Sequence, residues 1–88
     1  MSADEFEVAE SAAYSFGLDP DWMAAERERT PLLRFFAFGH LPPHLAEISA
    51  PFCELAWSLC ANLEPSAERT VALRKLLESK DAAVRSSL

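Results

Sequence analysis

Glycine and cysteine are scarce in this chain of 88 residues, which has two of each. Two glycines cannot build a glycine-rich phosphate loop, and the sequence has neither a CxxC nor an HExxH motif. The two histidines, His40 and His44, have a metal-binding spacing only on a continuous helix, which Pro42 and Pro43 interrupt. We therefore expect no enzymatic activity, no metal site and no cofactor.

The two cysteines, Cys53 and Cys60, lie seven residues apart in a segment that is predicted to be one helix. A helical rise of about 10 Å separates them, whereas a disulfide needs Cα atoms within about 7 Å of each other. We therefore expect two free, buried thiols, as is typical of proteins in a reducing compartment.

Long hydrophobic runs are also missing. No apolar run approaches the roughly 20 residues that a membrane-spanning helix needs. Residues 1–7 are acidic, whereas a secretory signal begins with basic residues and continues with apolar ones. These features predict a cytoplasmic protein without a membrane partner.

Positive charge is in short supply, because 14 acidic side chains face 8 basic ones and the net charge is −6. Residues 1–30 hold eight acidic and two basic side chains, whereas residues 65–88 hold three acidic and five basic ones. Binding of duplex nucleic acid depends on a broad basic surface. The charge therefore excludes a long nucleic acid as partner, but it allows a small anion held by a few cations.

Apolar residues are abundant, at half of the chain, and their pattern is helical. Residues 1–35 are predicted to form an acidic arm of two short helices. Ser2 and Glu5 have the spacing of a capping box, and Gly17 can end the first helix. Asp19, followed by proline, is the expected N-cap of the second helix, which should end before a Thr-Pro pair.

Residues 36–88 are predicted to form a helical hairpin. One long helix should cover about residues 44–63 and a second about residues 67–86, with Ser66 as its N-cap. A connection this short forces the helices to run antiparallel. The expected fold is therefore all-α, an antiparallel hairpin with a short helical N-terminal arm.

The first long helix is apolar on almost every side. It contains Pro51, which should either kink it or open a new helix capped by Ser49. One regularly spaced stripe consists of Leu45, Ile48, Phe52, Leu55 and Leu59. A single partner helix cannot cover such a surface, and a chain of this size has a marginal core. We therefore expect a homo-oligomer.

An aromatic run, Phe35, Phe36 and Phe38, has two interpretations. Phenylalanine is most often a core residue. Alternatively, Phe36 and Phe38 share a face with Arg34 if the segment is extended, and aromatics beside an arginine suit a nucleobase attached to a phosphate. Periodicity does not decide between helix and extended chain here.

The basic residues of the second long helix also have two interpretations. They can be a solvated surface, paired with Glu78 and Asp81 at helical spacing. Alternatively, the first turns can bind an anion, because free backbone N–H groups and the helix dipole favour negative charge there. The residues that cluster near these turns are Arg69, Thr70, Arg74 and Lys75.

A family resemblance involves the same residues. Phe36 and Phe38 precede a His-Leu-Pro-Pro turn at residues 40–43, and a Pro-Ser turn lies at residues 65–66. The following helix carries Glu68, Thr70, Ala72, Leu73, Lys75, Leu76, Glu78, Ala82, Ala83 and Arg85. In these features residues 36–85 resemble the short helical-hairpin sponges with which phages counter cyclic-oligonucleotide immune signalling. These are the anti-CBASS type, related to the anti-Thoeris sponges, and small uncharacterised phage proteins of the same group.

The resemblance implies a hexamer that sequesters a cyclic di- or trinucleotide in pockets between protomers without cleaving it, in the host cytoplasm if a phage encodes the chain. It implies base stacking on Phe38, and phosphate contacts from Thr70, Lys75 and Arg85. Cys53 stands where the family has a phosphate-binding lysine. The expected ligand-binding residues are Arg34, Phe36, Phe38, His40, Arg69, Thr70, Arg74, Lys75 and Arg85. The alternative is an oligomeric module that binds a host protein through the acidic arm and an apolar helix face.

Overall fold

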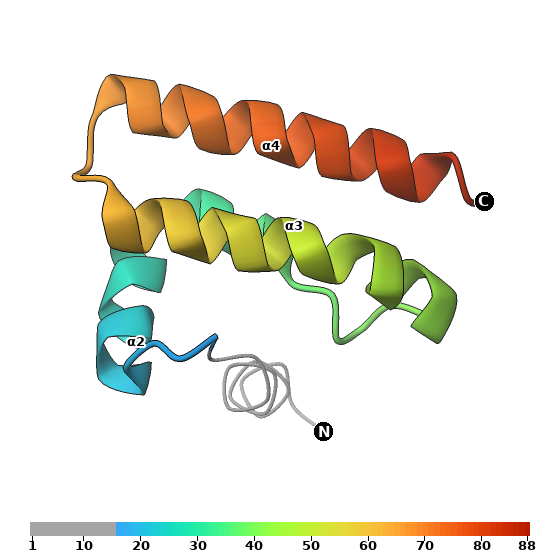
Figure 1. The fold of residues 1–88 in the computed structure, drawn as a ribbon, viewed down its shortest axis with the longest axis horizontal. Coiled ribbons are helices and arrows are strands. Elements are labelled where there is room, and N and C mark those ends of the chain that lie inside the picture. Colours follow the sequence, from blue (N-terminus) through green and yellow to red (C-terminus); the bar gives the residue numbers. More distant parts are fainter. Residues whose placement is uncertain (1–15) are drawn as a thin grey trace.

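The computed structural model describes residues 16–88 (Figure 1). This part of the chain contains helices and connecting segments but no strand, so the predicted all-α class is confirmed. The elements are α2 (Pro20–Arg29), the 3₁₀ helix η1 (Pro31–Phe36), α3 (Pro43–Asn62) and α4 (Ala67–Arg85). The predicted first helix of the arm, with Ser2 and Glu5, lies outside the described residues.

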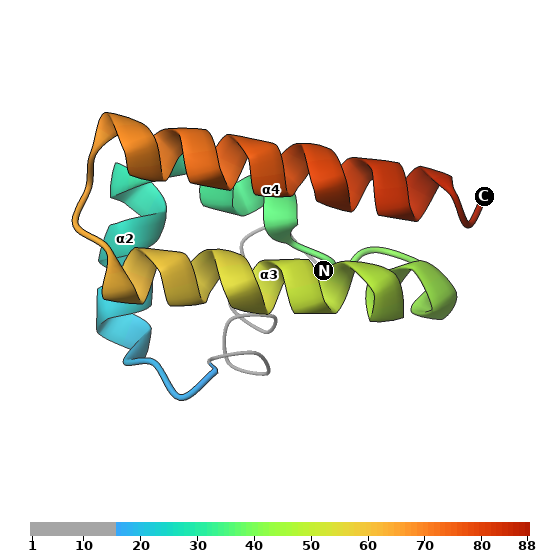
Figure 2. The same ribbon diagram turned by 45° about the horizontal axis from the view of Figure 1, so that its top comes forward.

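The two long helices, α3 and α4, lie side by side and run in opposite directions (Figures 1 and 2). A short connection at residues 63–66 joins them. The helix α2 lies across the end of the pair at which this connection is found. The 3₁₀ helix contacts α2, α3 and α4, so it joins the arm to the two long helices.

Local capping interactions begin two of the helices as the sequence predicts. The Asp19 carboxylate accepts a hydrogen bond from the Trp22 backbone N–H at 3.2 Å, and the Ser66 hydroxyl accepts one from the Arg69 N–H at 3.0 Å. Each cap satisfies an N–H group that has no partner within its helix. Gly17, at φ 77°, adopts the left-handed conformation in which glycine carries no steric cost.

The helix α3 is continuous through Pro51, so of the two predicted alternatives the new helix does not form. Ser49 lies inside the helix and is buried, and among the described residues its hydroxyl has no hydrogen-bond partner. The stripe that faces the core is rotated from the expected one. Its buried members are Leu45, Ser49, Cys53, Ala56, Trp57 and Cys60. Leu55, which belongs to the expected stripe, is 48% exposed.

The hydrophobic core takes side chains from all four elements. Met23 comes from α2, Leu33 and Phe36 from η1, Trp57 from α3 and Leu73 from α4. The predicted boundary between residues 35 and 36 therefore falls inside η1, whose side chains lie in this core. No helix in the described part of the chain has the length and apolar character needed to cross a membrane.

Candidate functional site

A cleft of about 300 Å³ lies between the segment around η1 and the C-terminal half of α4; we call it the cationic cleft. Three cationic side chains line it, Arg34, Lys80 and Arg85, against one carboxylate, Asp81. The remaining lining residues are Phe35, Ala37, His40, Leu41 and Val84. The excess of positive charge suits an anionic ligand.

An exposed aromatic ring stands beside these cations. Phe35 is 54% exposed, and the guanidinium carbon of Arg34 lies 5.5 Å from the centroid of its ring. This distance is within the range of a cation–π contact, which orients the guanidinium at the cleft. Lys80 is held at the cleft by an ion pair of 3.0 Å between its Nζ and Oδ1 of Asp81. The cleft therefore combines a stacking surface with hydrogen-bond donors for an anion.

Three of the residues predicted from the sequence meet in this cleft: Arg34, His40 and Arg85. Phe36 and Phe38 do not join them, because they lie in the core with 0% and 2% of their surface exposed. Neither ring presents a face to a base, so the core interpretation holds for both. The exposed ring is that of Phe35, which the alternation argument omitted because it assumed an extended segment rather than a 3₁₀ turn.

Three further predicted residues lie elsewhere on α4. Thr70, Arg74 and Lys75 are exposed, and none of them lines the cationic cleft. The Thr70 hydroxyl donates a hydrogen bond of 3.1 Å to the Ser66 carbonyl oxygen, and the Lys75 Nζ lies 3.7 Å from Oε2 of Glu78. These three residues form a solvated surface in the single chain.

Arg69 also departs from the predicted role, because its side chain is buried in an internal network. One terminal nitrogen donates to Oε1 of Glu26 at 2.8 Å and to the Thr30 hydroxyl at 3.0 Å. The other donates to the Leu63 carbonyl oxygen at 2.9 Å and to the Cys60 carbonyl oxygen at 3.4 Å. The guanidinium is thus committed to joining α2 to the end of α3, and it is not placed to bind a ligand phosphate.

Glu26 is the acceptor at the centre of this network. Its carboxylate accepts hydrogen bonds from Arg69, from the Thr30 hydroxyl at 2.8 Å and from two nitrogens of Arg29. Burial alone would raise the pKa of Glu26, but the hydrogen bonds from Arg29, Thr30 and Arg69 outweigh it and lower the pKa below 4.5. Glu26 is therefore a buried, ionised carboxylate in the native state.

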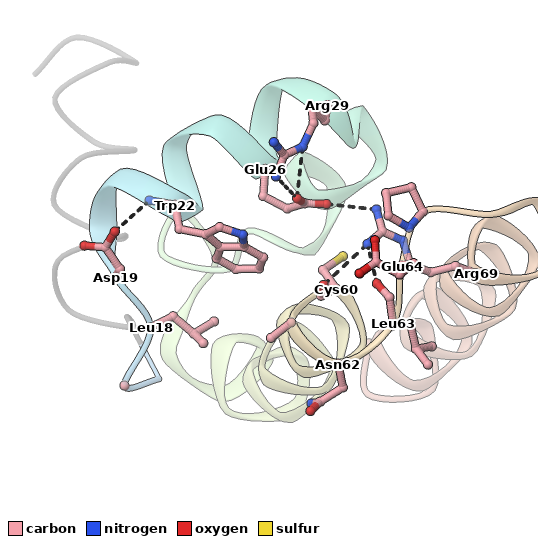
Figure 3. Close-up of a pocket in the computed structure, with 13 residues that line it drawn as sticks. Leu18, Asp19, Trp22, Glu26, Arg29, Cys60, Asn62, Leu63, Glu64 and Arg69 are labelled. Atoms are coloured by element: carbon pink, nitrogen blue, oxygen red, sulfur yellow. Dashed lines mark hydrogen bonds and ion pairs between the residues drawn. The ribbon is translucent and has the colours of Figure 1, made fainter.

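A larger cleft, of about 630 Å³, lies where α2 meets the connection between α3 and α4 (Figure 3); we call it the junction cleft. Trp22 forms part of its wall and packs edge-on against Trp57, with 6.1 Å between the ring centroids. Cys60 lies in the wall across from Trp22 (Figure 3). Burial raises the pKa of the Cys60 thiol, which the nearby positive charge of Arg69 opposes, so the thiol is protonated near neutral pH.

No sequence pattern predicts the junction cleft, because its lining comes from two segments that only the fold brings together. The lining residues are Gly17, Leu18, Asp19, Trp22, Glu26, Arg29, Cys60, Ala61, Asn62, Leu63, Glu64, Pro65 and Arg69. In the described part of the chain, no group of three or more His, Cys, Asp or Glu side chains is arranged to hold a metal ion. Both clefts thus offer stacking, charge and hydrogen bonds.

Comparisons with protein-family models, with curated proteins and with solved structures find no match to this chain.

Proposed function

We propose that this chain binds a cyclic oligonucleotide signal in the cationic cleft and sequesters it without cleaving it. Such an activity serves immune evasion by a phage, because a sequestered signal does not activate its effector. The observation that carries the proposal is the meeting of Arg34 and His40 with Arg85, from a distant part of the sequence, beside the exposed ring of Phe35.

The chemistry of the cleft matches the two parts of a nucleotide. A base can stack on Phe35, which contributes about 1–3 kcal/mol per base irrespective of the base. The guanidinium groups of Arg34 and Arg85 can donate paired hydrogen bonds to phosphate oxygens. These interactions hold a nucleotide and provide no step that would break its phosphodiester bonds.

The size of the cleft favours a shared ligand. A volume of about 300 Å³ is at the lower end for small-molecule sites, so one protomer accommodates about one nucleotide unit. A cyclic di- or trinucleotide then requires contacts from more than one copy. The proposal therefore includes a homo-oligomer of helical hairpins, and the family resemblance favours a hexamer.

The test is thermal unfolding with and without a panel of cyclic dinucleotides, cyclic trinucleotides and ADP-ribose-type signals. A ligand present at 100 times its Kd stabilises the folded state by about 2.7 kcal/mol, a shift of about 11–22 °C in a domain of this size. Arg34→Ala, Phe35→Ala and Arg85→Ala should each remove the shift. Glu54→Ala is the control, because Glu54 is exposed on α3 outside both clefts. No shift with any member of the panel would refute the proposal.

A second candidate function is an oligomeric module that binds a host protein through the acidic arm and the apolar face of α3. The observation that favours it is the exposure of two leucines, Leu55 within α3 and Leu63 at its C-terminal cap. Substitution of Leu55 by Asp should then abolish capture of the host protein while nucleotide binding is unaffected. Retained capture by Leu55→Asp would count against this candidate.

A further inference from the structure

The junction cleft has the composition of a site for an arginine side chain. Trp22 presents an indole ring that is held edge-on against Trp57, and aromatic faces attract guanidinium groups. Leu18 and Leu63 add apolar surface for the methylene groups of such a side chain. Figure 3 shows Leu18, Asp19 and Trp22 on one side of the cleft and Asn62, Leu63 and Glu64 on the other.

The charged groups of the junction cleft that could bind a further ligand are carboxylates. The carboxylate of Glu26 is already compensated by Arg69 and Arg29. Asp19 and Glu64 also line the cleft, and within residues 16–88 neither is joined to a cation by an ion pair. A cation that enters the cleft therefore meets one aromatic ring and two carboxylates without an ion pair, of which Asp19 is also the N-cap of α2.

A matching cation lies on the outer face of α4. Val71, Arg74 and Lys75 are all exposed and share one face of the helix, opposite to the face that buries Leu73. Val71 is 42% exposed, so it adds apolar surface beside the two cations. Within the described part of the chain, Arg74 makes no ion pair.

Arg74 does not line the junction cleft of its own chain, where Arg69 of the same helix occupies the buried side. The cations that line the cleft, Arg29 and Arg69, are both paired with Glu26, so a further cation would have to come from another molecule. The distribution of charge favours a second copy, because residues 1–30 hold eight acidic and two basic side chains whereas residues 65–88 hold three and five. Complementary charges of this kind steer association and determine its orientation.

We infer that the junction cleft of one copy receives Arg74 of a second copy, with its guanidinium on Trp22 and between the carboxylates of Asp19 and Glu64. Val71 of the second copy then packs against Leu63 at the edge of the cleft. This inference specifies the interface of the assembly that the proposed function includes, and it does not depend on the nucleotide ligand.

The test is a charge-swap experiment with the full chain, read by sedimentation equilibrium. Glu64→Lys and Arg74→Glu are both substitutions of exposed side chains, so we expect both variants to fold, as circular dichroism can verify. Each variant alone should have the mass of one chain, because like charges then face each other at the interface. An equal mixture of the two should recover the wild-type mass, because each cleft again meets an opposite charge.

Glu54→Lys is the matched control, since it reverses an exposed charge on α3 outside both clefts and should keep the wild-type assembly. High salt should weaken the wild-type assembly, as it screens exposed charges. A wild-type protein with the mass of one chain would overturn the inference. Single variants that remain assembled, or a mixture that does not recover, would overturn it as well. The two proposals can fail separately, because sedimentation without nucleotide tests the junction cleft, whereas the thermal shift of the wild-type protein with the nucleotide panel tests the cationic cleft.

Discussion

Replacing Arg69 by Met should destabilise the fold strongly, because it removes the buried cation that contacts the Glu26 carboxylate and leaves this carboxylate with Arg29, whose side chain is 55% exposed. Removing one member of a buried ion pair costs about 3–5 kcal/mol. The substitution also removes the donors to the Leu63 and Cys60 carbonyl oxygens. A domain of this size has a total stability of about 5–10 kcal/mol, so this one change is expected to consume about half of it.

The corresponding fall in melting temperature follows from the same numbers. Each kcal/mol lowers the Tm of a domain of this size by about 4–8 °C, so a fall of at least 12 °C is expected on this basis. Thermal unfolding followed by circular dichroism measures it. Glu54→Met is the control, because it replaces an exposed charged side chain of α3 that lies outside both clefts, and its effect should stay within about 0.5 kcal/mol.

A double variant separates the ion pair from general damage to packing. Glu26→Leu combined with Arg69→Met removes both buried charges, and such replacements are often neutral or stabilising. The double variant should therefore be clearly more stable than Arg69→Met alone, with a coupling energy of about 1–3 kcal/mol. A cost below about 1 kcal/mol for Arg69→Met, or a double variant no more stable than the single one, would refute the argument.

Three further predictions concern residues of the same region. Because the pKa of Glu26 is lowered in the folded state, its ionisation stabilises the fold above pH 4.5, and this contribution is lost as the pH falls through the native pKa. Glu26→Gln should therefore weaken the fall in the free energy of unfolding at acid pH. An unchanged fall would contradict this. Ser66→Ala removes the N-cap of α4 and should cost about 1 kcal/mol in urea unfolding, whereas Ser66→Gly should cost less. Cys53 is buried in the core and forms no disulfide, so a thiol reagent should modify it only at the rate of unfolding. Rapid modification of Cys53 in the native protein would show the core to be open.

Local sequence determined where the helices begin and end. The Asp19 and Ser66 caps act on N–H groups three residues away, and a Thr-Pro pair ends α2 at Arg29. These interactions lie within one helical turn, so they can be identified without knowledge of the fold. The same holds for the all-α class, because the spacing of apolar residues has the helical period in both long helices.

The tertiary structure alone decided which side chains are buried and which meet. α3 is apolar on nearly every side, so its sequence does not identify the face toward the core, and packing selected the stripe that contains Ala56 rather than Leu55. The 3₁₀ turn of η1 likewise buried Phe36 and left Phe35 exposed.

The roles of the charged residues were decided in the same way. Arg69 and Glu26 are 43 residues apart in the sequence, and Arg34 and Arg85 are also far apart. No local pattern predicts such contacts, because their energies depend on the burial and distance that packing creates. The helices and the net charge of the chain therefore follow from the sequence. The packing of α2 and η1 against α3 and α4 places Arg69 in the buried network and brings Arg34 and Arg85 into one cleft.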